Sequence, residues 1–193
     1  MTANKFQNLK VSEKKLIFES VSDKTGMPAF AVEKDWWVTQ TLSCIFGMEI
    51  GKHLVFKGGT SLSKAWKLID RFSEDVDLAI DRSFFGFNGD LSKNQRTQLR
   101  KTAGAYISDT FLNELKEAFS DSGINDITIK LVEANSSDQD PRIIEVYYPN
   151  IIPTSIYIKP RIQVEVGSRS LREPYTVMNL SSLVDEIYED KGF

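Results

Sequence analysis

The sequence predicts an α+β domain in which a mixed β-sheet is flanked by helices and preceded by a pair of N-terminal helices. Three observations support this fold class: a helical pattern before residue 50, a strand–turn–helix–strand unit between residues 53 and 80, and polar–apolar alternation after residue 126. The 193 residues, 41% hydrophobic and 26% charged, suffice for one domain with a buried core.

The N-terminal part predicts two helices that pack on this core. The first covers residues 12–22 and is followed by a break at Gly26-Met27-Pro28. The second covers residues 29–46, with Gly47 as its stop. Its predicted apolar face consists of Phe30, Val32, Trp36, Trp37, Leu42, Ile45 and Phe46. We therefore expect a helical segment over 1–50, a core over 51–180 and an acidic C-terminal helix or tail over 181–193.

The central unit combines two short strands with a glycine turn. Its parts are a strand at 53–56, the glycine pair, a helix at 62–69 and a strand at 74–80. Gly58 and Gly59 permit a tight turn or a close backbone approach. Thr60 or Ser61 can then cap the helix.

The second half predicts one long helix and three further strands. A glycine-punctuated loop at 84–90 precedes the helix at 92–119. The buried side of this helix is predicted to contain Leu99, Tyr106, Ile107, Phe111, Leu115 and Phe119. The strands are expected at 126–133, 142–148 and 156–166, the first two joined as an antiparallel hairpin by the turn SSDQDP.

Composition excludes several classes of site. A net charge of -3 argues against a broad basic surface for nucleic acid. His53 is the single histidine, so a multi-histidine zinc site is excluded, and Cys44 is the single cysteine, which excludes an intrachain disulfide and predicts a buried, inert thiol. The sequence shows neither a signal peptide nor an apolar run long enough for a membrane span, so we expect a cytoplasmic protein without a membrane partner.

Asp75 and Asp77 are the first candidates for chemistry. Residues two apart in a strand share a face, so the pattern places both carboxylates on the same side of the sheet. A hard divalent cation such as Mg²⁺ relieves the repulsion between such carboxylates. The alternative is a solvent-facing strand with alternating acids.

The glycine turn is the second candidate. Backbone N–H groups at Gly58-Gly59-Thr60-Ser61, together with a helix start, can cradle the phosphates of a nucleotide. The spacing differs from both GxxxxGK[ST] and GxGxxG, which excludes a Walker P-loop and a dinucleotide-binding fingerprint. An ordinary turn and N-cap is the alternative.

The strand KPRIQVEVGSR supplies a third candidate. Its alternation places Lys159, Arg161, Gln163 and Glu165 on one face and Ile162, Val164 and Val166 on the other. Glu165 would add a third carboxylate if this strand lies beside Asp75 and Asp77. The alternative is a half-solvated edge strand.

The run LVFKGGTSLSKAWKLIDRFSEDVDLAI and the upstream VEKDWWVT strongly resemble the AbiEii/AbiGii-type toxin nucleotidyltransferases of type IV toxin–antitoxin modules. That family belongs to the DNA polymerase beta-like nucleotidyltransferase superfamily. The resemblance covers roughly residues 32–168 and implies a nucleotidyltransferase fold. Lys34 and Asp35 fit the VEKD part of the pattern, although a salt bridge within or between helices explains them equally well.

The resemblance also implies roles for individual residues. Gly58, Gly59 and Ser61 match the phosphate-binding turn, and Thr60 lies between them. Asp75 and Asp77 match the metal-binding pair, with Glu165 as a weaker match to the third acid, and the implied cofactor is two Mg²⁺ ions, with Mn²⁺ as the other candidate metal. Lys57, Lys64 and Arg71 flank the turn and are expected either to steady the triphosphate or to be solvated.

The implied function is a toxin that moves a nucleoside monophosphate from an NTP to a hydroxyl of RNA, tRNA in particular, with a cognate antitoxin as partner. Family members usually continue into a helical C-terminal region, which we expect this chain to lack, so a catalytically impaired nucleotide-binding or partner-binding member is one alternative. A small-molecule nucleotidyltransferase is another. A homodimer or a separate chain is expected to cover sheet surface that the missing helices leave exposed.

Overall fold

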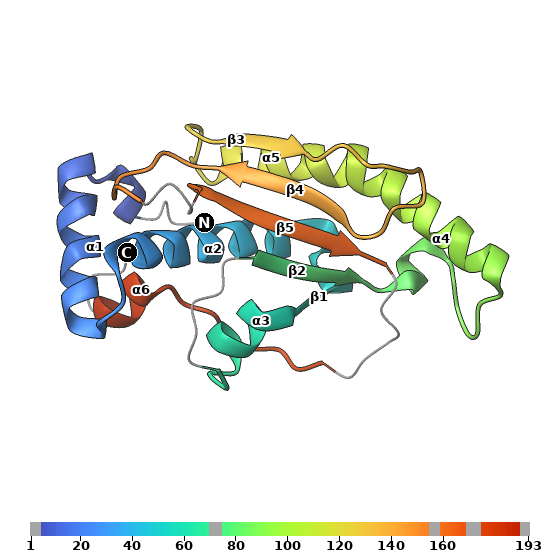
Figure 1. Ribbon diagram of the computed structural model, residues 1–193, viewed down its shortest axis with the longest axis horizontal. Helices are drawn as coiled ribbons and strands as arrows, with labels where there is room; N and C mark the ends of the chain where they lie inside the picture. Colours follow the sequence, from blue (N-terminus) through green and yellow to red (C-terminus); the bar gives the residue numbers. More distant parts are fainter. Residues whose placement is uncertain (1–4, 70–74, 155–158, 169–174, 190–193) are drawn as a thin grey trace.

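A computed structural model describes residues 5–69, 75–154, 159–168 and 175–189 as a five-stranded sheet with its main helical layer behind one face (Figure 1). The strand order is β1-β2-β5-β4-β3, in which β2 and β5 are parallel and the other neighbours are antiparallel. The strands are β1 Leu54–Lys57, β2 Asp75–Ile80, β3 Thr128–Leu131, β4 Arg142–Tyr147 and β5 Arg161–Gly167. The predicted mixed sheet and the β3–β4 hairpin are confirmed.

The helices follow the predicted order. They are α1 Val11–Thr25, α2 Ala29–Gly47, α3 Gly58–Thr60, α4 Lys93–Tyr106, α5 Leu112–Asp121 and α6 Leu183–Ile187. A π-helical turn, Ile107–Phe111, joins α4 to α5, so the long predicted helix is present with a local widening. Its predicted inward side chains are buried except Tyr106, which is half-buried. None of the helices in the described ranges is long and apolar enough to cross a membrane.

The core lies between one face of the sheet and the helices α2 and α5. Val76, Val146 and Val164 alternate with more exposed neighbours along their strands and have 0% exposure. They share one apolar cluster with Trp36 of α2 and Leu115 of α5. Figure 1 shows these two helices behind the sheet, so the opposite face, which carries the other half of each strand's side chains, is the open one.

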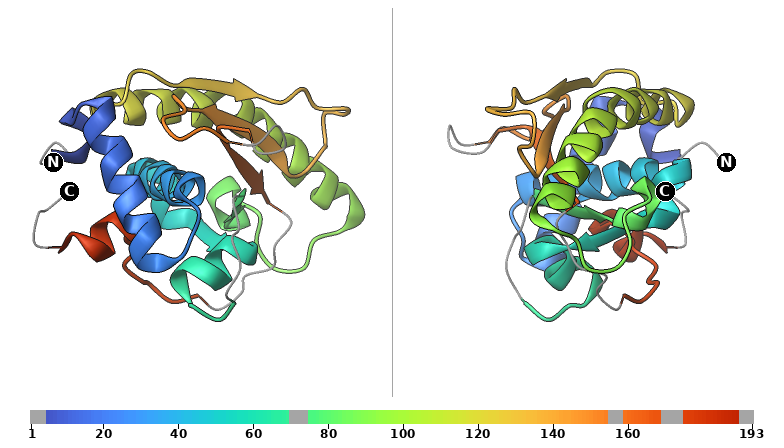
Figure 2. Two further views of the ribbon diagram at one scale, coloured as in Figure 1. Left: turned by 60° about the vertical axis from the view of Figure 1, so that its left-hand side comes forward. Right: turned by 90° about the vertical axis from the view of Figure 1, so that its right-hand side faces the viewer.

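Helix α2 is surrounded on nearly all sides. The sheet covers one side, α5 lies along another, and α1 and α6 lie at its N-terminal part (Figure 2). Trp36 and Trp37 are 3% and 6% exposed, as expected for its apolar face. Phe46 was predicted on that face but is 40% exposed, whereas its neighbour Ile45 is fully buried, so the buried face at the end of α2 excludes Phe46.

The central unit differs from its prediction in where the helix begins. We expected a helix at 62–69 capped by Thr60 or Ser61, but α3 begins at Gly58 and passes into a π-helical turn, Ser61–Ala65. Residue Lys67 then adopts a positive φ of 52°, which ends the helical course. Thr60 and Ser61 therefore lie inside the helical turn, where neither hydroxyl acts as an N-cap.

Strand β5 is shorter than predicted. We expected a strand over 156–166, but it begins at Arg161, and residues 155–158 lie outside the described part of the chain. Its burial alternates strictly, with Ile162, Val164 and Val166 inside. The predicted separation into a polar and an apolar face is therefore correct.

Candidate active site

Asp75 and Asp77 lie at the start of β2, on the open face of the sheet. Val76 between them is fully buried, whereas Asp75 is exposed and Asp77 is half-buried. The two carboxylates therefore lie on the side of the sheet that α2 and α5 leave open, as the spacing predicts.

Glu165 lies beside this pair. Strand β5 runs parallel to β2, and its register pairs Glu165 with Asp77 and Gln163 with Asp75. Residues paired in this way lie on the same face of neighbouring strands, about 4.8 Å apart. The condition that the sequence set for a third carboxylate, adjacency of the two strands, is met.

The glycine turn is packed against Asp77. Gly58 has a φ of +75°, and a Cβ added there would lie 2.7 Å from the Asp77 carboxyl carbon. Only glycine fits this position without moving the carboxylate or the turn. The last residue of β1, Lys57, is also the strand partner of Asp77. The turn and the acid therefore occupy one compact site.

Thr60 fixes the turn to the strand. Its side chain is buried, at 2% exposure, and its hydroxyl donates a hydrogen bond to the main-chain oxygen of Asp75. Ser61, at 5% exposure, opens the π-helical turn directly afterwards. π-Helical turns of this kind are frequent at functional sites. The observed role of Thr60 is structural, and its contact with a nucleotide stays a prediction.

Lys64 already has a partner. Its Nζ lies 2.6 Å from Oδ1 of Asp35, and the two side chains are 7% and 15% exposed. The other oxygen of Asp35 accepts a hydrogen bond of 2.8 Å from the main-chain N–H of Leu183. Nucleotide binding by Lys64, which stays a prediction, would require this pair to open. Arg71, the other predicted triphosphate contact, lies outside the described residues.

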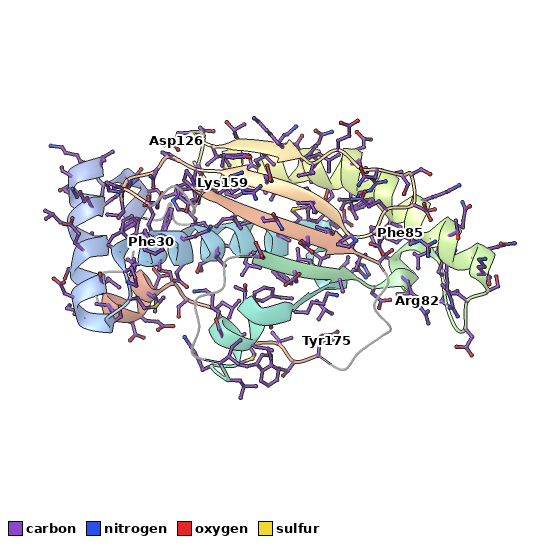
Figure 3. The ribbon with its side chains drawn as sticks, in the orientation of Figure 1. Phe30, Arg82, Phe85, Asp126, Lys159 and Tyr175 are labelled. Carbon is purple, nitrogen blue, oxygen red and sulfur yellow. The ribbon has the colours of Figure 1, made fainter. Side chains whose placement is uncertain are left out.

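The VEKD run holds three distant segments together. Glu33, at 1% exposure, accepts hydrogen bonds of 2.9 Å from the N–H groups of Ile151 and Ile152. Lys34 donates to the carbonyl oxygen of Lys159, which Figure 3 shows near the start of β5. Burial raises the pKa of Glu33, and the two N–H donors oppose this shift. The pair between Asp35 of α2 and Lys64 of the π-helical turn is a salt bridge between helical segments, which the sequence had left open as an alternative for Asp35.

The chemistry of the acids fits a hard divalent cation. Asp75, Asp77 and Glu165 offer carboxylate oxygens, the ligands that Mg²⁺ prefers, and the glycine at position 58 leaves the space beside Asp77 that a Cβ would fill. Among the described residues, no three acidic, histidine or cysteine side chains lie close enough together to hold a metal ion as they stand. Backbone register places the acids, and their side-chain rotamers would complete the site.

Comparison with known families shows which family the chain belongs to. A family model described as "Nucleotidyl transferase AbiEii toxin, Type IV TA system" matches residues 42–192. The chain belongs to this family. No curated protein and no solved structure matches the chain significantly.

The AbiEii match covers the whole candidate site and defines the class of enzyme. It includes the glycine turn, β2 and β5, and membership identifies the chain as a nucleotidyltransferase of a toxin family. The expected resemblance began near residue 32, whereas the match begins at residue 42 and extends further, to 192. The VEKD run therefore lies outside the matched region, in keeping with the structural contacts it makes.

Proposed function

We propose that this AbiEii-family protein transfers a nucleoside monophosphate from an NTP to an acceptor hydroxyl, using Asp75, Asp77 and Glu165 as ligands for two Mg²⁺ ions, which Mn²⁺ can replace. The observation that carries the proposal is the β2–β5 register, which pairs Asp77 with Glu165 directly. Asp75 lies on the same face, two residues along the strand. Three hard oxygen donors beside a glycine turn suit a metal–triphosphate complex.

Each part of the site has a task in this reaction. The Gly58–Ser61 turn binds the triphosphate through its backbone, and Thr60 keeps the turn against β2. With metal ions bound, the acids would hold the triphosphate and the acceptor so that the hydroxyl oxygen attacks the α-phosphorus in line. The new P–O bond forms as the bond to pyrophosphate breaks, pyrophosphate leaves with the electron pair, and the hydroxyl proton passes to a carboxylate of the site or to water. When bound, the metal ions neutralise the acids and polarise the phosphates.

RNA, and tRNA in particular, is the proposed acceptor, and a cognate antitoxin is the proposed partner. Both proposals rest on the resemblance to the toxin family, whose description names a type IV toxin–antitoxin system. The chain itself, with a net charge of -3, does not favour a broad phosphate-binding surface. Transfer to a small hydroxyl compound is therefore the alternative for the acceptor.

The test is label transfer from α-labelled NTPs with Mg²⁺ and total RNA, in the presence or absence of small hydroxyl acceptors. We expect transfer by the wild type and its loss in Asp75→Asn, Asp77→Asn and Glu165→Gln. Asp23→Asn is the matched control, because Asp23 is exposed on α1, away from the sheet. Full transfer by the three site variants would rule out the assigned acids.

Nucleotide binding can be followed separately through Trp66. This residue directly follows the π-helical turn and is 48% exposed, whereas Trp36 and Trp37 are buried. Solvent-accessible tryptophan fluorescence therefore reports mainly on the turn. Quenching by an NTP without transfer to any acceptor would favour the catalytically impaired alternative.

A further inference from the structure

A row of polar side chains on the open face of the sheet leads to Glu165. Gln163 donates a hydrogen bond of 3.0 Å from Nε2 to Oε1 of Glu165. Arg161 donates to Oε1 of Gln163 at 3.4 Å and forms an ion pair with Glu145. The hydroxyl of Tyr147 donates to the other oxygen of Glu145 at 2.5 Å. The side chains of β4 and β5 thus form one connected network.

We propose that Gln163 is a positioning residue that holds the Glu165 carboxylate for metal binding, and that Arg161 fixes the orientation of the Gln163 amide. This inference rests on the proposed role of Glu165 as a ligand. It adds a residue that touches neither metal nor nucleotide.

The direction of the hydrogen bonds supports this assignment. A guanidinium has only donors, so the atom of Gln163 that faces Arg161 must be the carbonyl oxygen. The amide nitrogen then necessarily faces Glu165 and donates to it. Glu145 in turn holds Arg161 from the neighbouring strand, with 15% and 23% of the two side chains exposed. Each hydrogen bond is therefore donated toward the next residue, from Arg161 to Gln163 and from Gln163 to the proposed ligand Glu165.

The geometry also leaves room for the ligand role. Gln163 contacts Oε1 of Glu165, so Oε2 is the oxygen that can reach a cation near Asp77. Gln163 is itself the strand partner of Asp75, so it lies beside that aspartate on the same face of the sheet. Partners of this kind orient metal ligands, and their loss typically weakens metal affinity or activity by about 10–100-fold.

The test uses Gln163→Met, which keeps the length of the side chain and removes both hydrogen-bonding groups. Mn²⁺ binding to the full chain, measured by calorimetry with a nonhydrolysable NTP analogue, is expected to weaken about 10–100-fold. The Mg²⁺ concentration that gives half-maximal transfer should rise by a similar factor, and saturating Mg²⁺ should restore much of the rate. Arg161→Met should give a smaller shift, because Gln163 can still reach Glu165.

Gln98→Met is the matched control, since Gln98 is exposed on α4. Unchanged Mn²⁺ affinity in Gln163→Met, with a lowered Tm or without one, would show a purely structural network and overturn the proposal. That result leaves the proposed function standing if Asp77→Asn and Glu165→Gln still lose metal binding. Wild-type metal affinity in those two variants would instead refute the proposed ligands themselves.

Discussion

Glu33 and Asp35 of α2 accept hydrogen bonds from main-chain N–H groups of distant segments, whereas Asp75, Asp77 and Glu165 lie side by side on the open face of the sheet. Glu33 is buried and the Asp35 side chain is only 15% exposed, and the two residues bind the loop after β4, the π-helical turn and the start of α6. The second group is placed by strand register. Both groups contain acids in short motifs of the sequence, yet their surroundings are opposite.

The difference suggests how to separate acids that hold a fold from acids proposed to bind a metal ion. A buried carboxylate that accepts N–H donors has its charge compensated in part within the protein. Carboxylates on neighbouring positions of one face repel one another, and a bound cation relieves that repulsion. Removing an acid of the first group should therefore lower stability, and removing one of the second should mainly lower activity.

The largest effect is expected from the direct comparison of Asp77→Asn with Glu33→Ala. Asp77→Asn should reduce transfer about 10³-fold or more, because several kcal/mol of charge stabilisation in the transition state are lost. Glu33→Ala should destabilise the fold by about 1–3 kcal/mol for each of the N–H groups of Ile151 and Ile152 that it leaves unpaired. Urea unfolding and label transfer, measured on both variants, test the contrast. The contrast between the two groups of acids would be refuted if Asp77→Asn lost as much free energy of unfolding as Glu33→Ala.

The next effect concerns the pair between Lys64 and Asp35. Lys64→Met leaves a largely buried carboxylate without its cation, so a loss of about 3–5 kcal/mol in the free energy of unfolding is expected. The control is Lys67→Met, whose ion pair with Glu186 has side chains 60% and 39% exposed and should contribute less than about 1 kcal/mol. Equal losses in the two variants would contradict a buried role for Lys64.

The double variant Lys64→Met with Asp35→Asn separates stability from nucleotide binding. It should recover much of the lost stability, because no unpaired charge remains and the amide oxygen can still accept from Leu183. If Lys64 also contacts the triphosphate, this stable variant should show a raised KM for the NTP. An unchanged KM would confine Lys64 to its structural pair.

A smaller effect is expected at the contact between the glycine turn and Asp77. Gly58→Ala should cost about 1–2 kcal/mol for a left-handed non-glycine residue, and it should also displace the Asp77 carboxylate. Gly86→Ala is a matched control: its φ is +78°, but an added Cβ would meet no atom within 4 Å. Similar stability losses combined with a loss of transfer in Gly58→Ala alone would isolate the contact. Equal transfer by both variants would disprove it.

The sequence predicted the elements that depend on short-range pattern. The DVD spacing predicted a shared face for Asp75 and Asp77, and alternation predicted the two faces of β5. These predictions succeeded because side-chain direction in a strand follows from a period of two residues. The glycine pair likewise permitted a tight turn or a close approach, and Gly58 makes such an approach to Asp77.

Long-range pairing was beyond the sequence. Nothing in the VEKD run reveals that Asp35 would meet Lys64 or that Glu33 would hold Ile151 and Ile152, because these contacts join segments far apart in the chain. The predicted start of α3 was also wrong, because the Thr60 hydroxyl, which we expected to cap the helix, instead donates to the main-chain oxygen of Asp75. The register between β2 and β5 could not be predicted for the same reason, because it depends on the parallel pairing of two strands that are far apart in the chain.

The smallest effect is a pH dependence of stability that arises from Glu33. Burial raises its pKa above the ordinary value of 4.5, so the folded protein binds this proton more tightly than the unfolded chain does. Between 4.5 and the raised value, stability must therefore fall as pH rises, the reverse of the usual carboxylate contribution. Urea unfolding of the wild type and Glu33→Gln across this interval isolates the effect, because only the wild type has the group. A difference between the two proteins that grew in favour of the wild type with rising pH would mean that the N–H donors of Ile151 and Ile152 outweigh burial.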